Sequence, residues 1–431
     1  MPSDPGSPAP APPAAIVELP RPLLDAGLAA RAREALGDLA RDLAAVPASR
    51  GPAWDRMLAG GGAGLALGMA FLACSGLVEV GEADALARLQ AAVDGLEQAF
   101  ASPSLFSGFT GTAWVVEFLQ DGFIERDETL NQDIDAALLA CLGHDPPPSC
   151  ELIDGLAGLG VYALERFPRG ASATLLETLF DRVEARAAWS REGARWAAPA
   201  LPDAVVAAYG LAPAPPGTVD LGLSHGQPGV IAFLAALVLQ GIRGERARTL
   251  LEGAVGWLLA HEGTTDGRSA FTHVIEPGAD VRPSCRLAWC YGDLGIALAL
   301  GHAGRAAARE DWSARAVALL EAAARREPAP GEVEDPMLCH GAMGVAHLFH
   351  RAFLSTGRDS LRAAATDWTR RALDFHTPGA GLGGFRRRAR SAWHDDPGLL
   401  EGSMGLALAL LAALEPRDPA WDRCLLLSLR P

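Results

Sequence analysis

Two kinds of helical segment alternate along this chain. In the first kind, apolar residues recur at positions i, i+3, i+4 and i+7 with charged residues opposite them, as in residues 22–46 and 82–100. This period is typical of an amphipathic helix that buries one face. In the second kind, a Gly-x-x-Gly motif leads into a run that is apolar on nearly every side, which is typical of a helix buried all round. The alternation predicts an all-α protein with an outer and an inner layer of helices.

The second kind of segment is an internal repeat. The first glycines of its seven copies are Gly61, Gly108, Gly155, Gly226, Gly292, Gly341 and Gly402. A Gly-x-x-Gly pair alone is weak evidence in a chain with 48 Gly, but each of these pairs precedes an apolar run. The amphipathic segments lie at 22–46, 82–100, 173–187, 245–261, 313–327 and 361–376, with a weaker one near 128–143. Seven units of an outer helix followed by an inner helix predict an α/α toroid, with the glycine-rich helix starts at one end.

The spacing of the motifs leaves room for insertions in two places. The segments 195–220 and 263–285 contain Pro, Gly and short β-like runs, and they precede units four and five. We therefore expect small inserted loop or β segments there. Residues 1–21 are rich in Pro and Ala and are expected to form a disordered tail. Residues 22–431 are expected to form one toroid domain.

Composition and charge exclude several classes of protein. The net charge of −15 gives no basic surface for nucleic acid. No apolar run approaches the roughly 18 residues needed for a transmembrane segment. Seven Cys, an odd number, occur without a secretory signal pattern, so we expect reduced thiols and a cytoplasmic protein. Neither the composition nor the charge of the chain indicates its oligomeric state.

Candidate chemistry is concentrated just before three of the seven motifs. His225 lies in "LSHG", Cys290 in "RLAWCYG", and Cys339 with His340 in "LCHG". In a closed ring these positions converge at one mouth. Two Cys and one His are three ligands for zinc, and an open fourth position is typical of a catalytic rather than a structural site. Adjacent residues diverge by about 100° in a helix, so Cys339 and His340 can converge only at a loop-to-helix junction.

Each of these residues also has an ordinary structural interpretation. A lone buried Cys290 more often acts as a small apolar residue, and a lone His340 more often caps a helix or lies in a core. His347 and His350 lie inside an apolar run and are interpreted as core residues. The joint occurrence at equivalent repeat positions favours the zinc hypothesis. The remaining cysteines are interpreted as structural: Cys74, Cys141, Cys150, Cys285 and Cys424.

Four motifs together resemble the signature blocks of a known family. In chain order they are "GLSHGQPG", "RLAWCYGDLG", "CHGAMG" and "LLEGSMGLALALL". They are similar to those of lanthionine synthetase C proteins, the LanC-like cyclases, and the resemblance extends from about residue 22 to the end. It implies a toroid of seven inner and seven outer helices that holds one Zn²⁺ per chain. It also implies addition of a peptide Cys thiol to dehydroalanine or dehydrobutyrine, which forms a thioether ring.

The resemblance also implies roles for individual residues. The zinc ligands are Cys290, Cys339 and His340, and the catalytic His is His225. The family's Arg corresponds to Arg286, and its aromatic pair to Trp289 and Tyr291. The family has an Asp four residues before the glycine motif of unit three, where this sequence has Glu151; Asp154 is the alternative for that role.

The expected reaction requires a thiolate nucleophile, a proton donor and a group that stabilises an enolate. Zinc binding deprotonates a thiol, and attack of the thiolate on the dehydro residue leaves an enolate that needs a proton at Cα. His225 is the candidate acid–base because an unperturbed His titrates near neutrality. Arg286 is expected to stabilise the enolate oxygen or to orient His225, and Tyr291 is an alternative acid. The expected partners are a dehydrated precursor peptide and a separate dehydratase.

Three alternative functions stay open at this point. The same residues would serve addition of a small thiol such as glutathione to dehydroamino acids. A non-catalytic zinc-holding scaffold that binds a peptide or a dehydratase is the second. A carbohydrate-active toroid is the third, since such enzymes need paired carboxylates. Its candidates are Glu151, Asp154, Asp293 and Glu401, but it leaves the Cys and His cluster unexplained.

Overall fold

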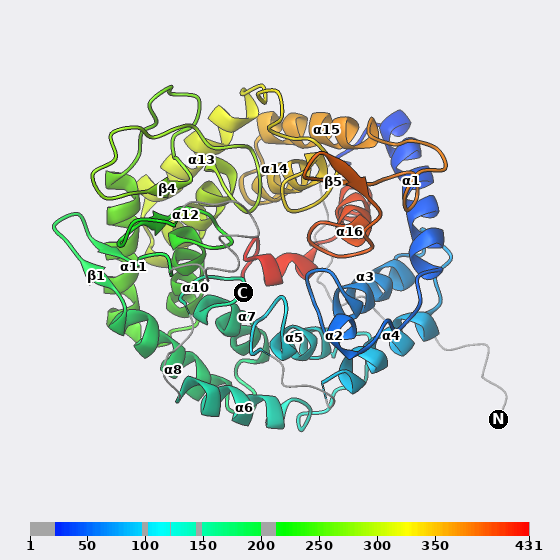
Figure 1. Cartoon of the computed structure of the whole chain (residues 1–431), viewed down its shortest axis with the longest axis horizontal. Helices are drawn as coiled ribbons and strands as arrows, with labels where there is room; N and C mark the ends of the chain where they lie inside the picture. Colours follow the sequence, from blue (N-terminus) through cyan, green and yellow to red (C-terminus); the bar gives the residue numbers. More distant parts are fainter. Residues whose placement is uncertain (1–21, 97–101, 121, 144–148, 200–212, 431) are drawn as a thin grey trace.

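The chain forms a ring of helices in two layers (Figure 1). The computed structural model describes residues 22–96, 102–120, 122–143, 149–199 and 213–430, so the expected tail over 1–21 lies outside the described residues. Among the described residues, seven inner helices follow the seven glycine motifs: α3 (Gly62–Ser75), α5 (Phe109–Leu119), α7 (Leu156–Arg166), α10 (Gln227–Leu239), α12 (Asp293–Ala307), α14 (Ala342–Thr356) and α16 (Ser403–Leu414). The predicted α/α toroid is confirmed.

The outer layer consists of the amphipathic helices. Within the described part of the chain they are α1 (Ala26–Ala44), α4 (Glu82–Asp94), α6 (Gln132–Leu142), α8 (Ser172–Ala185), α11 (Gly244–Ala260), α13 (Glu310–Ala324) and α15 (Asp359–Leu373), and α2 (Pro52–Asp55) is a short turn of helix. The layers differ in burial as the pattern predicts. Helix α10 buries every residue from Gln227 to Leu237, whereas α1 buries one stripe that includes Leu28, Leu36 and Leu43.

The pairing of inner and outer helices differs from the predicted order. Most outer helices pack on the inner helix that precedes them in the chain, as α4 does on α3 and α13 on α12. Helix α1 instead packs on α16, the last inner helix. Side chains also join the start of the chain to α15, since Arg31 pairs with Asp374 at 2.9 Å and the Thr366 hydroxyl donates to the Leu23 carbonyl at 2.9 Å. The first helix of the chain therefore closes the ring against the last unit.

The repeated glycines permit close packing at the helix starts. A Cβ on the second Gly of any of the seven motifs would lie 1.8–2.7 Å from the carbonyl oxygen six residues earlier. At Gly111 and Gly405 the Cβ would also lie 2.9 Å from a Leu Cβ of the adjacent unit, Leu58 and Leu338 respectively. Only Gly allows the backbone to approach so closely.

Hydrogen bonds join the seven helix openings into a closed belt. Six are between backbone groups and one comes from a Ser side chain. In ring order they are Leu58 N to Phe106 O (3.1 Å), Ser104 Oγ to Ile153 O (3.0 Å), Leu152 N to Ser224 O (3.1 Å), Ser224 N to Cys290 O (3.4 Å), Trp289 N to Cys339 O (3.0 Å), Cys339 N to Leu400 O (2.8 Å) and Leu400 N to Ala59 O (2.9 Å). The belt fixes the residues just before the glycines relative to one another.

The C-terminal segment closes the opposite end of the ring. The 3₁₀ helix η1 (Ala420–Leu425) lies at the centre of the ring, drawn in red in Figure 1. It contacts the C-terminal ends of inner helices, because Arg423 pairs with Glu165 of α7 at 3.1 Å and Asp422 pairs with Arg351 of α14. The two ends of the toroid are therefore built differently.

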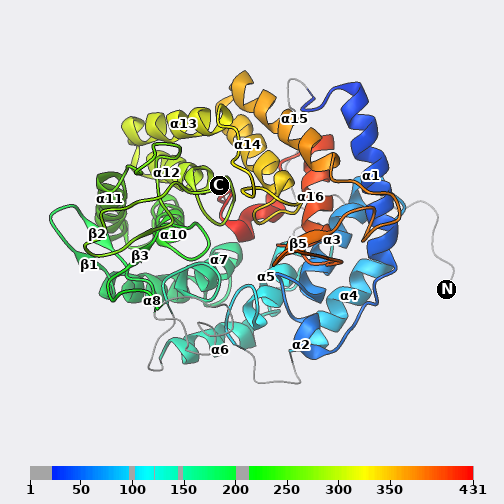
Figure 2. The same cartoon turned by 45° about the horizontal axis from the view of Figure 1, so that its top comes forward.

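Short antiparallel strand pairs extend from the ring (Figure 2). Strands β1 (Ala188–Trp189) and β2 (Ala194–Arg195) pair before unit four, and β3 (Val219–Asp220) pairs with β4 (Val274–Ile275). The two predicted insertions are thus confirmed and joined to each other, although residues 200–212 of the first lie outside the described residues. A third pair, β5 (Arg387–Ala389) with β6 (Ala392–His394), precedes unit seven and was not predicted. No helix in the described residues is long and apolar enough to cross a bilayer.

Candidate metal centre

Two thiols and one imidazole meet at the glycine-rich end. Cys290, Cys339 and His340 each offer one ligand atom, and these atoms lie within 4.8 Å of one another. Cys290 and Cys339 both stand two residues before the first Gly of their motifs, so they occupy the same repeat position in adjacent units. Turn residues precede α14 at this point, which is the junction that convergence of Cys339 and His340 requires.

The three groups are coupled through their protons. A hydrogen bond from the Cys339 thiol lowers the pKa of Cys290 well below its usual range, with a further contribution from His340. The same interaction raises the pKa of Cys339, and hydrogen bonding to Cys290 raises the pKa of His340. The cluster therefore stabilises an anionic sulfur in a buried position, which suits a bound cation.

The donor set fits zinc. Tetrahedral zinc keeps Cys and His ligand atoms about 3.5 to 4 Å apart, so the cluster needs only small side-chain adjustments to bind it. Among the described residues this is the one group of three or more Cys, His, Asp or Glu residues whose ligand atoms lie this close. Other buried thiols differ, because burial raises the pKa of Cys150 to about 11 and that of Cys285 to about 12.

His225 lies beside this cluster and is held by Glu151. The two side chains approach at 2.9 Å between Nδ1 and Oε2. Burial favours neutral His225, but the hydrogen bond and the charge of Glu151 outweigh it and raise the pKa of His225. The His225 ring is 49% exposed, and its Nε2 makes no hydrogen bond with the described residues. The neighbouring Ser224 bonds to the Cys290 carbonyl through its backbone N at 3.4 Å and its hydroxyl at 3.3 Å.

The structure distinguishes the two carboxylates proposed for unit three. Glu151 is buried, and besides His225 it accepts from the backbone N–H groups of Ile153 at 2.9 Å and Asp154 at 2.6 Å. The carboxylate of Asp154 instead accepts from the Ser107 hydroxyl at 3.1 Å. Glu151, not Asp154, is therefore the acidic neighbour of His225.

The other predicted residues lie around the cluster with different surroundings. Arg286 is half-buried, makes no hydrogen bond with the described residues, and its charge contributes to the low pKa of Cys290. The Tyr291 hydroxyl donates to Asp220 at 2.8 Å, and burial together with that carboxylate raises the pKa of Tyr291. Trp289 is buried, and its indole N–H donates to the Leu425 carbonyl at 3.1 Å, so this side chain joins the two ends of the ring.

Two neighbours of the cluster were not found from the sequence. Asp220 accepts from Tyr291 and from the Gly222 N–H at 2.6 Å, and the His273 ring lies 5.5 Å from the Tyr291 ring between centroids. His273 is brought there by the pairing of β3 and β4, which no local pattern reveals. Asp220 had a signal, because an Asp stands six residues before the first Gly in four of the motifs: Asp55, Asp220, Asp335 and Asp396.

Comparisons with known proteins agree with this architecture. The family model described as lanthionine synthetase C-like protein matches residues 52–426. No curated protein matches the sequence. Seventeen chains of solved structures match, among them nisin cyclase, with a TM-score of 0.68 and 19% identity over 87% of this chain and 93% of that chain. At this identity the structural likeness shows the fold, and the family match covers most of the chain. The chain therefore belongs to the lanthionine synthetase C-like protein family.

Proposed function

We propose that this protein is a zinc-dependent cyclase that adds peptide Cys thiols to dehydroalanine or dehydrobutyrine and so forms lanthionine-type thioether rings. The observation that carries the proposal is the convergence of Cys290, Cys339 and His340 beside the His225–Glu151 pair. Family membership supports the same reaction. A purely structural metal site would have no use for a half-exposed His oriented by a buried carboxylate.

Cys290, Cys339 and His340 would hold the zinc ion. When bound, zinc lowers the pKa of a coordinated substrate thiol, and two thiolate ligands moderate its Lewis acidity so that the substrate sulfur stays nucleophilic. The belt of hydrogen bonds positions the ligands, because Cys339 N donates to Leu400 and the Cys290 carbonyl accepts from Ser224.

His225 is the proposed proton donor at the substrate Cα. The new C–S bond forms at Cβ, the π electrons of the double bond move into an enolate, and Cα then takes a proton. With Nδ1–H donated to Glu151, protonated His225 has a second N–H at Nε2, which no described residue engages. The thiol releases one proton and Cα gains one, so His225 returns to its starting state once it is reprotonated. Its raised pKa increases the acid form near neutral pH.

Arg286 and Tyr291 receive different parts in this scheme. Glu151 already orients His225, so Arg286, whose guanidinium has no hydrogen-bond partner among the described residues, is assigned to the enolate oxygen. The Tyr291 proton is engaged by Asp220 at 2.8 Å. Tyr291 is therefore assigned to the wall of the site, and His225 is preferred as the acid.

A synthetic peptide with one Cys and one dehydroalanine tests the proposal. Zinc-loaded protein is expected to abolish alkylation of the Cys without changing the peptide mass, because ring closure is an isomerisation. The matched control is His225→Asn, which should keep its zinc and lose turnover. A protein that adds glutathione to a dehydroalanine peptide but does not close the ring would favour small-thiol addition. A zinc-loaded protein with neither reaction would favour the scaffold.

A further inference from the structure

An Arg-rich hairpin lies on the rim of the glycine-rich end and has no part in the proposed chemistry. We call residues 386–394, which include β5 and β6, the Arg hairpin. Arg387 pairs with Asp396 at 3.0 Å and with Glu401, and the Arg388 N–H donates to Asp335 at 3.0 Å. Glu401 and Asp335 belong to the openings of units seven and six, and Leu400, next to Glu401, accepts from the backbone N–H of Cys339 at 2.8 Å. The base of the hairpin is thus attached next to the metal centre.

The two faces of the hairpin carry different side chains. Successive strand residues point to opposite faces, so Arg387 with its acidic partners lies on one face, and Arg386 and Arg388 lie on the other. Arg388 is paired across the strands with Trp393. The guanidinium groups of Arg386 and Arg388 lie 5.8 and 5.5 Å from the Trp393 ring centroid. This second face therefore presents an indole next to two guanidinium groups.

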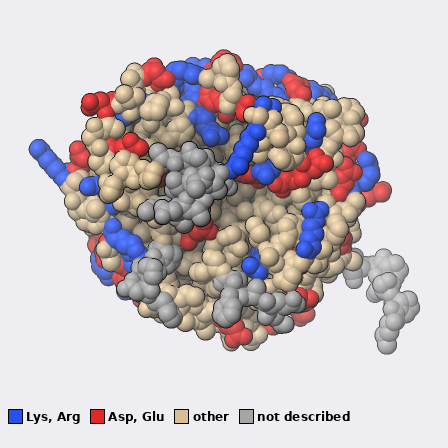
Figure 3. All heavy atoms as spheres, viewed as in Figure 1, with Lys and Arg blue, Asp and Glu red and all other residues tan. Residues whose placement is uncertain are grey.

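The side chains on this second face are exposed or only weakly paired within the described residues. Trp393 is 41% exposed. Arg386 pairs with no carboxylate among the described residues, and Arg388 has only a 3.5 Å contact with the exposed Glu334. The chain contains no Lys, so the basic groups beside acidic ones near β5 and α16 in Figure 3 are Arg side chains. Guanidinium groups bind carboxylates in a bidentate geometry.

We propose that the Arg386, Arg388 and Trp393 face of the Arg hairpin binds an acidic segment of the peptide substrate, separate from the segment that reacts. This inference rests on the proposed function, since it supplies the partner for that site. The protein has a net charge of −15, which disfavours binding of an acidic peptide over most of its surface. A local group of Arg side chains at the rim would therefore determine where such a segment binds. The indole covers apolar atoms of the same segment. Holding one part of the peptide at the rim raises the effective concentration of its Cys at the metal centre.

The test uses two synthetic peptides that share a Cys and dehydroalanine half. One carries four Asp and Glu residues in its other half, and the second carries Asn and Gln instead. The zinc-loaded Arg386→Glu/Trp393→Ala variant is expected to raise KM for the acidic peptide about tenfold or more, because a charge-assisted contact is replaced by repulsion. Its kcat, its zinc content and its KM for the neutral peptide should stay near those of the wild type.

Two controls keep the outcome specific. Arg191→Glu makes the same charge change on the β1–β2 hairpin, where Arg191 is exposed, and is expected to leave KM unchanged. Binding of the fluorescently labelled acidic peptide is measured separately, so the hairpin is tested even if the wild type closes no ring. Equal binding of the acidic and neutral peptides, equal weakening by the Arg191 variant, or full competition by a short single-stranded oligonucleotide would each overturn the proposal.

Discussion

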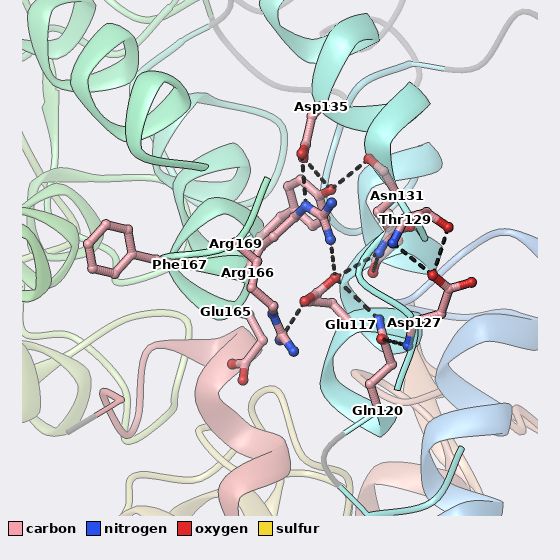
Figure 4. Close-up of polar contacts among 12 residues, drawn as sticks. Glu117, Gln120, Asp127, Thr129, Asn131, Asp135, Glu165, Arg166, Phe167 and Arg169 are labelled. Atoms are coloured by element: carbon pink, nitrogen blue, oxygen red, sulfur yellow. Dashed lines mark hydrogen bonds and ion pairs between the residues drawn. The ribbon is translucent and has the colours of Figure 1, made fainter. Parts of the chain in front are cut away.

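The two ends of the toroid differ in how completely their ionisable side chains are paired within the protein. Near the C-terminal ends of the inner helices, Figure 4 shows the guanidinium groups of Arg166 and Arg169 paired with the carboxylates of Glu117 and Asp135. Arg166 pairs with Glu117 and with Asp135, each at 2.8 Å, and the Tyr162 hydroxyl donates to Asp135 at 2.7 Å. Arg169 pairs with the second oxygen of Glu117 at 2.5 Å. The opposite charges of this network therefore compensate one another within the protein.

A second network of buried ion pairs ties η1 to the same end. Arg351 donates to Asp422 at 2.6 Å and to the Pro419 carbonyl at 2.7 Å, and His347 meets Asp422 at 2.8 Å. His347 and His350 are buried, as the core interpretation predicted. His347 and Asp422 hold the C-terminal segment in the ring, whereas neither ring nitrogen of His350 has a hydrogen-bond partner among the described residues.

The glycine-rich end also has ion pairs, such as His225 with Glu151, but some of its donors have no partner among the described residues. Cys290 and Cys339 have each other and His340, while the His225 Nε2 and the Arg286 guanidinium make no hydrogen bond with the described residues. Both side chains are partly exposed, so these donors can reach a molecule that enters the glycine-rich end. The comparison is therefore between guanidinium and carboxylate groups that pair with each other and donors at the glycine-rich end that have no partner among the described residues.

The largest expected effect is the loss of the reaction when a ligand is removed. Cys290→Ala should lower the rate of thioether formation on the order of a thousandfold or more, because a zinc centre contributes several kcal/mol to catalysis. Far-UV circular dichroism should stay unchanged, since the ion-pair networks at the other end are intact. Rates are measured by thiol alkylation and mass spectrometry. Cyclisation at the wild-type rate would remove Cys290 from the centre.

A second variant disrupts the ion-pair network at the C-terminal ends of the inner helices. Arg166→Met should lower the free energy of unfolding by about 3–5 kcal/mol, because it removes the buried guanidinium that Glu117 and Asp135 share. The folded fraction of this variant should still bind zinc. Urea unfolding followed by circular dichroism measures the change. A variant that is as stable as the wild type but has lost its metal would contradict the division between the two ends.

Substitution of His225 separates proton transfer from metal binding at the glycine-rich end. His225→Asn should lower kcat by about a hundredfold to ten-thousandfold, which is the usual contribution of general acid–base catalysis. Zinc content should be unchanged, because His225 is not part of the three-residue cluster. Steady-state kinetics on the zinc-loaded variant make the measurement. Normal turnover would exclude His225 from the mechanism.

A smaller effect concerns pH. His225 works as an acid, so activity should fall as pH rises through its pKa, which lies above the ordinary value of 6.5 because of Glu151. Glu151→Gln removes that charge while the burial that lowers the pKa remains, and the alkaline limb of the profile should therefore move to lower pH. Asp154→Asn is the matched control and should leave the limb in place. A shift in the opposite direction would contradict the assignment.

The smallest effect is expected at Tyr291. Tyr291→Phe removes one hydrogen bond to Asp220 and should cost about 0.5–1.5 kcal/mol of stability. The rate of thioether formation should change only a few-fold. Thermal unfolding and kinetics on the same sample decide between the two roles. A loss as large as that of His225→Asn would make Tyr291 the acid.

Much of this architecture was predictable from local pattern. The seven glycine motifs and their apolar runs predicted the inner helices, and the equivalent positions of Cys290 and Cys339 predicted that they meet. The pairing of α1 with α16 was not predictable, because it joins residues from the two ends of the sequence. The choice between Glu151 and Asp154 depends on the path of one loop. The position of His273 depends on the pairing of β3 with β4, and no local sequence period encodes either of these contacts.

The zinc content of three purified, reduced proteins tests the central claim most directly. The wild type should hold about one zinc per chain, and Cys339→Ala should hold none. Cys424→Ala should keep the metal, because Cys424 is also a buried thiol but lies at the opposite end, where its thiol donates to the Trp421 carbonyl at 3.3 Å. A wild type without metal, or equal zinc in the wild type and Cys339→Ala, would contradict the account.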